Sequence, residues 1–125
     1  MAIVGLGVDL ARIARFRNFV ERRSAVLERI FCPDEREYAL TRRDPAQALA
    51  ARFAAKEAFF KALGTGLRDG LSWQQVCVQR NELGCPSLIL SGRAAEMLAL
   101  RGARKTLLSY SHDGDYAVAT VILED

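Results

Sequence analysis

A charged pair, Glu57 and Lys61, interrupts the nearly apolar stretch RFAAKEAFFKALGTG at residues 52–66. Helical periodicity places Glu57 at the border of a phenylalanine stripe, with Lys61 one turn later on the same face. A carboxylate in apolar surroundings is costly unless it is paired or binds a cation. An ordinary helix pair explains the spacing by itself, so Glu57 becomes a site candidate only if other groups of suitable chemistry lie nearby.

A second carboxylate, Asp9, ends the apolar run at residues 3–10. A helix cap or the start of a loop is the commoner role for an acid in such a position. Two carboxylates from distant segments also suit one hard cation, because Mg²⁺ uses one or two carboxylates together with water and substrate phosphates. The two acids alone leave both interpretations open.

Gly64, Thr65 and Gly66 follow Lys61 after two apolar residues, Ala62 and Leu63. Glycines let backbone amides approach a phosphate, and Lys61 adds positive charge. The triplet is not a P-loop, because no Gly-Lys-Ser/Thr follows it. The preceding helix points its negative end toward this turn, so phosphate binding there depends on the lysine and the amides.

His112 is the only histidine, and it lies in a predicted tight hairpin at 112–115. A lone histidine is more often structural or exposed than catalytic, although a hairpin tip is reachable by a ligand. Ser109 and Ser111 lack the strand–turn–helix setting of a nucleophile elbow. The sequence therefore contains no convincing nucleophile and base for covalent catalysis.

The elements that must position these residues alternate in an order typical of an α+β domain. Strands are predicted over 3–10, 73–80, 86–90, 106–111 and 116–123, and helices over 12–23, 33–43, 45–63 and 92–101. The long helix is predicted to be buried, with Asp44 as N-cap, Pro45 at its first position and a stop at Gly64. At 125 residues, half of them hydrophobic, the chain is expected to form one domain, 1–125.

The cysteines and the N-terminus favour a cytoplasmic protein. Cys32, Cys77 and Cys85 show neither a CxxC pair nor metal-ligand spacing, which predicts reduced thiols. The opening residues lack the basic region of a signal peptide, and their apolar run is too short to span a bilayer.

The formal net charge is only +3, but arginines crowd one early segment. They are Arg12, Arg15, Arg17, Arg22 and Arg23, opposed by Glu21 alone. Such a helix presents either an ordinary solvated face or a surface for an anionic partner, namely nucleic acid, a membrane or an acidic protein. A nucleic-acid-binding domain is favoured only by these arginines, because the predicted strands lack the aromatic pairs of RNA-binding platforms.

Taken together, these residues resemble the holo-acyl-carrier-protein synthases, the family of small trimeric 4′-phosphopantetheinyl transferases. The matching segments are GLGVDL at 5–10, the stretch 52–66, the turn 84–86 and SYSHDGDYAVA at 109–119. They occur in the family's order over essentially the whole chain. The resemblance implies the phosphopantetheinyl transferase fold, a small antiparallel sheet packed against helices. It also implies transfer of 4′-phosphopantetheine from coenzyme A to a serine of apo acyl carrier protein, with release of adenosine 3′,5′-bisphosphate, in support of fatty acid biosynthesis.

The resemblance further implies the roles of individual residues. Asp9 and Glu57 match the magnesium-binding acids, and together with Lys61 and His112 they are the implied catalytic residues. Coenzyme A is implied to contact Arg52, Lys61, Gly64, Thr65, Gly66, Pro86 and His112. The group that takes the serine proton stays open between Glu57, a metal-bound water and His112.

The implied partners are an acidic protein and further copies of the chain. Arg15, Phe19, Arg22 and Arg23 match the helix that meets acyl carrier protein, a mixed charged and apolar surface suited to a transient interface. Family members of this size are trimers with active sites between subunits, so a neighbouring chain is expected to donate His112. Neither nucleic acid nor a membrane is an expected partner.

Overall fold

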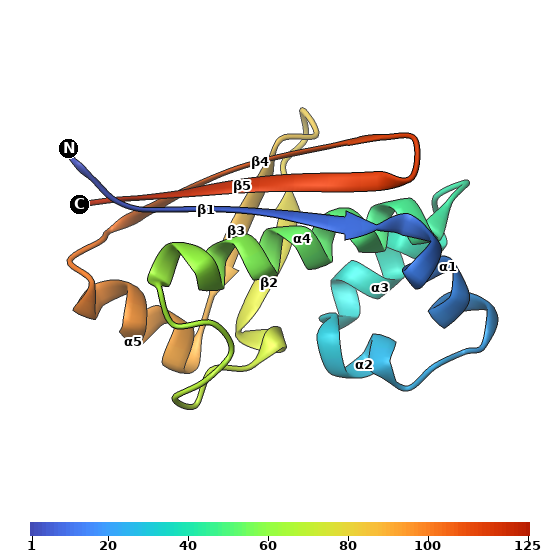
Figure 1. Cartoon of the computed structure of the whole chain (residues 1–125), viewed down its shortest axis with the longest axis horizontal. Helices are drawn as coiled ribbons and strands as arrows, with labels where there is room; N and C mark the ends of the chain where they lie inside the picture. The colour runs from blue at the N-terminus through green and yellow to red at the C-terminus, as the bar shows by residue number, and fades with distance from the viewer.

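A three-stranded antiparallel sheet lies along one side of a long buried helix in the computed structural model, which describes residues 1–125 (Figure 1). The elements are β1 (Ile3–Arg12), α1 (Ile13–Glu21), α2 (Val26–Ile30), α3 (Pro33–Leu40), α4 (Pro45–Leu63), a 3₁₀ turn (Trp73–Gln75), β2 (Val76–Arg80), β3 (Pro86–Leu90), α5 (Gly92–Leu100), β4 (Lys105–Asp113) and β5 (Tyr116–Glu124). The larger sheet has the order β1-β5-β4, and β2 pairs with β3 in a separate hairpin. The predicted α+β class, with a small antiparallel sheet packed on helices, is confirmed.

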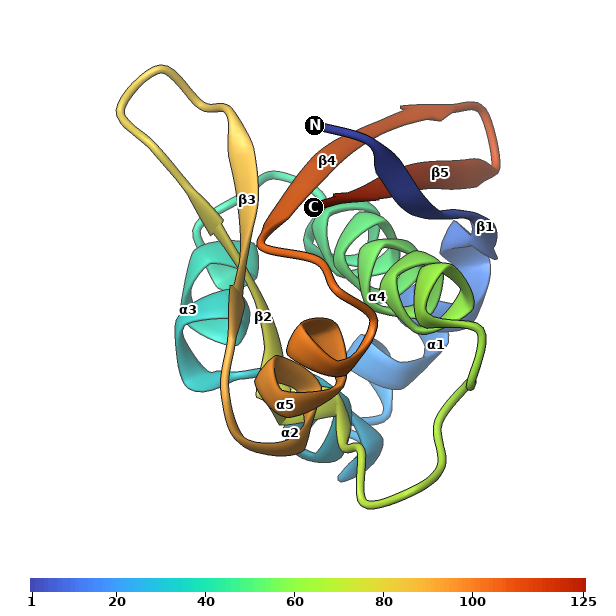
Figure 2. The same cartoon turned by 90° about the vertical axis from the view of Figure 1, so that its left-hand side faces the viewer.

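Helix α4 is the centre of the packing. Viewed nearly end-on, it lies beneath the larger sheet, with α3 and the β2–β3 hairpin to one side (Figure 2). Its predicted start at Pro45 and stop at Gly64, which has a φ of 82°, are both confirmed. Asp44 occupies the N-cap position, but the prediction that its side chain caps the helix is wrong. Its carboxylate instead accepts a hydrogen bond from Arg17 of α1 at 2.9 Å.

Two glycines allow β1 to lie directly against α4. A Cβ atom on Gly5 would come within 2.5 Å of the Ala62 carbonyl oxygen, and one on Gly7 within 2.7 Å of the Ala62 nitrogen. Ala58 and Ala62 present small side chains at the same contact and are buried. Any larger residue at Gly5 or Gly7 would push β1 away from α4. The close contact that these glycines allow therefore sets the position of Asp9 relative to α4.

Long-range pairing moves several element boundaries. Strand β1 continues past the predicted residue 10, because Ala11 and Arg12 pair with Ala117 and Tyr116 of β5. The predicted helix 12–23 is therefore shorter, and the separate helix α2 was not foreseen. His112 belongs to β4 rather than to the tip of the hairpin, because it pairs with Ala117 and the turn is formed by residues 114 and 115.

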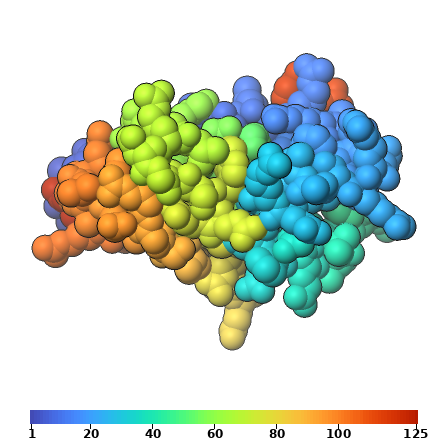
Figure 3. Space-filling view, turned by 90° about the horizontal axis from the view of Figure 1, so that it is seen from below, coloured from blue at the N-terminus to red at the C-terminus, as the bar shows by residue number.

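The face opposite the larger sheet is built from α2, α3, α5 and the segment 64–72, with the β2–β3 hairpin projecting from it (Figure 3). No helix combines the length and the apolar character needed to cross a membrane. The prediction of three reduced thiols is wrong for two of them, since Cys32 and Cys77 form a disulfide. Folding brings α3 and β2 together across 45 residues of sequence, a proximity that cysteine spacing cannot reveal. Cys85 is free and exposed.

Candidate active site

Asp9 and Lys61 form an ion pair where β1 crosses α4. Side chains alternate along β1, so Asp9 points to the helix side with Gly7 and Ala11, and only 14% of its side chain is exposed. Lys61 Nζ donates to Asp9 Oδ1 at 2.8 Å and to the carbonyl oxygen of Val8 at 3.1 Å. A strand residue and a helix residue that are 52 positions apart in sequence thus meet.

Glu57 completes this cluster from one turn earlier on α4. It is only partly buried in a helix whose other interior residues are almost all inaccessible. Burial raises the pKa of Glu57, and the neighbouring negative charge of Asp9 raises it further. Lys61 and then Arg15 act in the opposite direction. The pKa of Glu57 is thus raised overall, and Asp9 lies close enough for the two carboxylates to repel each other.

The turn after α4 lies beyond Lys61. Gly64 adopts a left-handed conformation and closes the helix, with its N–H donating to the carbonyl oxygens of Phe60 and Lys61. Gly66 also has a positive φ, 66°, and a Cβ there would meet nothing within 4 Å. The backbone of this turn is therefore open to an approaching ligand, although the helix end contributes a negative rather than a positive potential.

Arg52 lies in a different place, on the side of α4 that faces α3 and β4. Its guanidinium is buried, stacks over the Tyr38 ring with 4.3 Å between Cζ and the ring centroid, and lies 5.9 Å from the Tyr110 ring centroid. Arg52 Nε has no hydrogen-bond partner. The residue borders a cavity of about 490 Å³ that is also lined by Arg42, Arg43, Arg80 and His112. The four arginines outnumber Asp44, the one acid at the cavity, which makes it suitable for an anion.

The structure therefore divides the predicted site residues into two groups. Asp9 is on β1 and His112 on β4, the two outer strands of the sheet, which lie about 10 Å apart with β5 between them. Across β5, His112 is level with Ala11 rather than with Asp9. Pro86 pairs across the β2–β3 hairpin with Arg80, which places it near the second group. Within one chain, the acids and Lys61 form one group, and Arg52, Pro86 and His112 form another.

The predicted partner surface on α1 borders the acidic cluster. Arg15 is exposed, and its Cζ lies 5.1 Å from the centroid of Phe53 and 5.9 Å from that of Phe19. Phe19 is half-buried, while Arg22 and Arg23 are exposed. Phe19 thus lies beside one accessible arginine, Arg15, which is also close enough to Glu57 to lower its pKa.

Sequence reasoning missed a buried ion pair on the same helix. Lys56 Nζ contacts Glu35 Oε1 of α3 at 2.7 Å, and both side chains are completely inaccessible. The same ammonium donates to the carbonyl oxygens of Trp73 at 3.1 Å and Val76 at 2.7 Å. A lysine inside an apolar helix signals that it needs a buried partner, but nothing in the sequence identifies Glu35 as that partner.

Known proteins resemble this chain over almost its whole length. Residues 5–121 match the family model described as the 4′-phosphopantetheinyl transferase superfamily. A holo-[acyl-carrier-protein] synthase from Syntrophotalea carbinolica is 57% identical over 96% of this chain and 94% of its own length. The enzyme of the same name from Trichlorobacter lovleyi is 54% identical over 98% of both chains.

Solved structures agree with the fold. The holo-[acyl-carrier-protein] synthase of Neisseria meningitidis superposes with a TM-score of 0.88 at 33% identity, covering 99% of this chain and 100% of that one. The synthase of Bacillus anthracis, solved in complex with CoA (3′,5′-ADP), superposes with a TM-score of 0.80 at 34% identity, covering 98% and 96%.

Proposed function

The chain belongs to the 4′-phosphopantetheinyl transferase superfamily, and we propose that residues 1–125 act as one domain, in the cytoplasm, with Mg²⁺ as cofactor. The activity is that of a holo-acyl-carrier-protein synthase. It transfers the 4′-phosphopantetheine group of coenzyme A to a serine of apo acyl carrier protein, releases adenosine 3′,5′-bisphosphate and supports fatty acid biosynthesis. The observation that carries the site assignment is the cluster of Asp9, Glu57 and Lys61, assembled from distant segments.

Asp9 and Glu57 are the residues that would hold Mg²⁺. Their donor set suits a hard cation, because both offer carboxylate oxygens and water and phosphate oxygens can complete the coordination. The raised pKa of Glu57 supports this assignment, since Asp9 is one of its causes and a cation would relieve that repulsion. When bound, Mg²⁺ would neutralise charge that builds on the leaving phosphate oxygen.

Lys61 would hold the diphosphate of coenzyme A beside the acids. Its ammonium already reaches over β1 to Asp9 and to the carbonyl oxygen of Val8, and about half of the side chain is exposed. A positive charge that is oriented before the substrate arrives stabilises developing negative charge at little reorganisation cost. The open backbone of Gly64, Thr65 and Gly66 comes soon after Lys61 in the chain and would contact the same diphosphate.

The serine hydroxyl of the carrier protein would attack the phosphate in line, so its proton must be accepted nearby. Glu57 is a suitable acceptor on this chain because its raised pKa makes the carboxylate more basic than an exposed glutamate. His112 is the other candidate in the proposed site, although it lies in the second group of residues. No enzyme nucleophile is needed for this direct transfer.

Arg52 and His112 would bind the nucleotide end of coenzyme A from a neighbouring subunit. Within one chain His112 lies on the opposite outer strand from Asp9 and Arg52 borders the same cavity as His112, and a second copy would bring this arginine-lined cavity against the acidic cluster. The outer face of the larger sheet supports such assembly, because Leu6, Val8 and Leu10 are each more than half exposed. Apolar side chains exposed in a row on a sheet indicate an interaction surface, and we assign it to a homotrimer.

The carrier protein would dock on α1. Arg15, Arg22 and Arg23 supply positive charge for an acidic partner, and Phe19 supplies an apolar contact among them. Because Arg15 lies close to Glu57, a protein bound along α1 would bring its serine to the acidic cluster.

Mass spectrometry of apo acyl carrier protein tests this function directly. Incubation with the purified chain, coenzyme A and Mg²⁺ is expected to add the mass of one phosphopantetheine group to the carrier protein. Omission of Mg²⁺ with a chelator present is expected to prevent the gain. An unchanged carrier protein under complete conditions would refute the proposal.

A further inference from the structure

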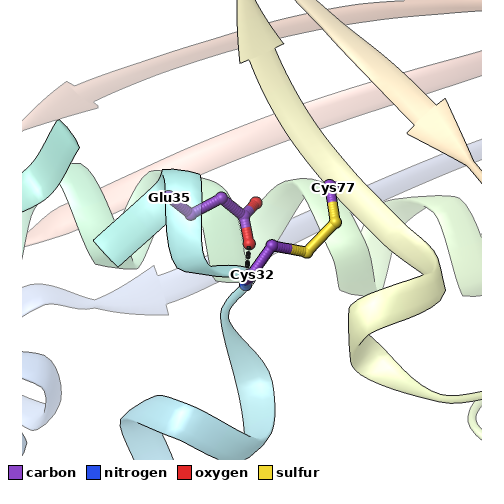
Figure 4. Close-up of side chains that lie close together, drawn as sticks. All are labelled: Cys32, Glu35 and Cys77. Carbon is purple, nitrogen blue, oxygen red and sulfur yellow. Dashed lines mark hydrogen bonds between the residues drawn. A yellow bond between two sulfur atoms is a disulfide. The ribbon is translucent and has the colours of Figure 1, made fainter. Parts of the chain in front are cut away.

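A disulfide outside the proposed active site joins α3 to β2. Cys32 is the residue before α3 and Cys77 lies on β2, with 6.1 Å between their Cα atoms (Figure 4). Cys32 is almost fully buried, whereas Cys77 is only partly buried. Both line an open cavity of about 590 Å³. A small molecule that enters this cavity can therefore reach the Cys77 sulfur.

The charged groups around the sulfurs do not favour a metal ion. Cys32, Glu35 and Cys77 lie close enough together to suggest three metal ligands. However, Glu35 accepts hydrogen bonds from the Cys32 N–H and the Val78 N–H, each at 2.8 Å, and it pairs with Lys56 at 2.7 Å. Both carboxylate oxygens are thus occupied, and a buried ammonium would repel a cation.

The surroundings of Cys32 favour attack on the disulfide by a thiolate. Lys56 Nζ lies 3.9 Å from Cys32 Sγ, and Cys32 stands at the N-terminus of α3. A helix N-terminus stabilises a thiolate, and Lys56 can donate a hydrogen bond to the sulfur although its charge is paired with Glu35. Cys32 is therefore the better leaving group when the disulfide is attacked.

We propose that Cys32 and Cys77 form a thiol–disulfide exchange site for low-molecular-weight thiols. A thiolate that enters the cavity attacks Cys77 Sγ and forms a mixed disulfide, while the Cys32–Cys77 bond breaks and Cys32 leaves as a thiolate with the bonding electron pair. A second thiolate then attacks the small molecule's sulfur in the mixed disulfide and releases Cys77. In total, two small thiols are oxidised to their disulfide and the protein disulfide is reduced to two thiols, with protons supplied by water.

The redox state of this pair also controls the neighbouring cavity. Tyr38, Arg52 and Arg80 line both the cavity at the disulfide and the one that contains His112. Tyr38 belongs to α3 and Arg80 to β2, the two elements that the disulfide joins, and their side chains form a hydrogen bond. Reduction releases this link and loosens the shared wall. This second step rests on the proposed function, in which the arginine-lined cavity binds the nucleotide end of coenzyme A.

Alkylation in glutathione buffers tests the exchange site without any assay of activity. The folded chain is equilibrated with mixtures of reduced and oxidised glutathione, quenched with acid, alkylated and analysed by peptide mass spectrometry. Cys32 and Cys77 are expected to become labelled together as the mixture becomes more reducing, while the exposed Cys85 is labelled in reducing mixtures as an internal control. Labelling of the pair under the most oxidising conditions, or resistance to reduction until denaturant is added, would overturn the exchange site.

Binding of adenosine 3′,5′-bisphosphate tests the coupling, because this ligand has no thiol that could itself react. Calorimetry is expected to show binding about threefold to tenfold weaker to the reduced chain, the loss of roughly one hydrogen bond. The double variant Cys32→Ser/Cys77→Ser is expected to bind equally in both buffers. Equal binding to oxidised and reduced wild type overturns the coupling, as does a redox effect that persists in the double variant. If neither state binds the nucleotide, the proposed function fails while the alkylation result still decides the exchange site.

Discussion

Lys56 and Glu57 are neighbours in sequence and have opposite surroundings. Lys56 is fully inaccessible, contacts the Glu35 carboxylate and donates to two backbone carbonyls. Glu57 is partly exposed beside Asp9, with Lys61 and Arg15 as the cations that act on it. One helix, α4, thus carries a closed ion pair on one side and an open acidic cluster on another.

We interpret this difference as one between a charge that stabilises the fold and a charge placed for the proposed reaction. At Lys56, burial lowers the pKa and outweighs the charge and hydrogen bond of Glu35, yet the ammonium keeps three direct partners, the Glu35 carboxylate and two backbone carbonyls. At Glu57, burial raises the pKa and the Asp9 carboxylate raises it further, while Lys61 and Arg15 oppose them only in part. Both pKa shifts disfavour the charged form, so what distinguishes Glu57 is a like charge beside it at a partly exposed position, which is typical of a binding or catalytic site.

Replacement of Lys56 is expected to have the largest effect on stability. Lys56→Met leaves the buried Glu35 carboxylate without its cation, which costs about 3–5 kcal/mol of unfolding free energy. Urea denaturation measures the loss. The double variant Lys56→Met/Glu35→Gln is expected to recover part of it, because no buried charge remains. A loss below about 1 kcal/mol would show that Lys56 is not a structural charge.

Removal of either acid in the open cluster is expected to abolish transfer while the fold persists. Asp9→Ala and Glu57→Ala should each lower kcat/KM by about 100-fold or more, a size typical for lost electrostatic stabilisation of a transition state. Phosphopantetheine transfer and the unfolding midpoint are measured on the same samples. Glu96→Ala, at an exposed position on α5, is the matched control. Near-normal turnover of either acid variant at limiting Mg²⁺ would remove that residue from the metal site.

Charge reversal on α1 is expected to weaken carrier-protein binding only. Arg22→Glu should raise the KM for acyl carrier protein by about threefold to tenfold, because an exposed charge contributes modestly, and leave the KM for coenzyme A unchanged. Arg15→Glu should act more broadly, since Arg15 also lowers the pKa of Glu57. Arg104→Glu, in the exposed segment before β4, is the control. An unchanged KM for carrier protein in Arg22→Glu would place the interface elsewhere.

The pH dependence of Glu57 is expected to give the smallest effect. Because the pKa of Glu57 is raised, kcat/KM should fall on the acidic side at a higher pH than an exposed glutamate would cause. Its ionised form is the one that the fold disfavours, so Glu57→Gln should be slightly more stable than wild type at neutral pH. This difference should vanish as the pH falls below the pKa of Glu57 in both the folded and unfolded states. A Glu57→Gln variant that is less stable at neutral pH would show that the carboxylate is structurally satisfied.

Local signals in the sequence were sufficient for much of the fold. Pro45 and Gly64 mark the ends of α4, and both positions behave as their backbone preferences require. The two hairpins and the buried character of α4 also follow from short-range patterns. The candidate acids Asp9 and Glu57 were recognisable because a carboxylate beside apolar residues is energetically unusual.

Contacts between distant segments were not predictable in the same way. Nothing local pairs Lys56 with Glu35 or Cys32 with Cys77, and the Tyr38–Arg80 wall beside Arg52 was missed for the same reason. The position of His112 followed from pairing with Ala117, which the turn residues alone did not reveal.

The sequence by itself determined most of the helices and strands, which family the chain resembles and which acids are unusual. Only the tertiary structure decided that Lys56 is paired with Glu35 while Glu57 has a second carboxylate beside it, and that His112 lies on the opposite outer strand of the sheet from Asp9. The physical reason is that backbone preferences act over a few residues, whereas burial and charge compensation depend on whichever distant groups the packing of α4 brings into contact.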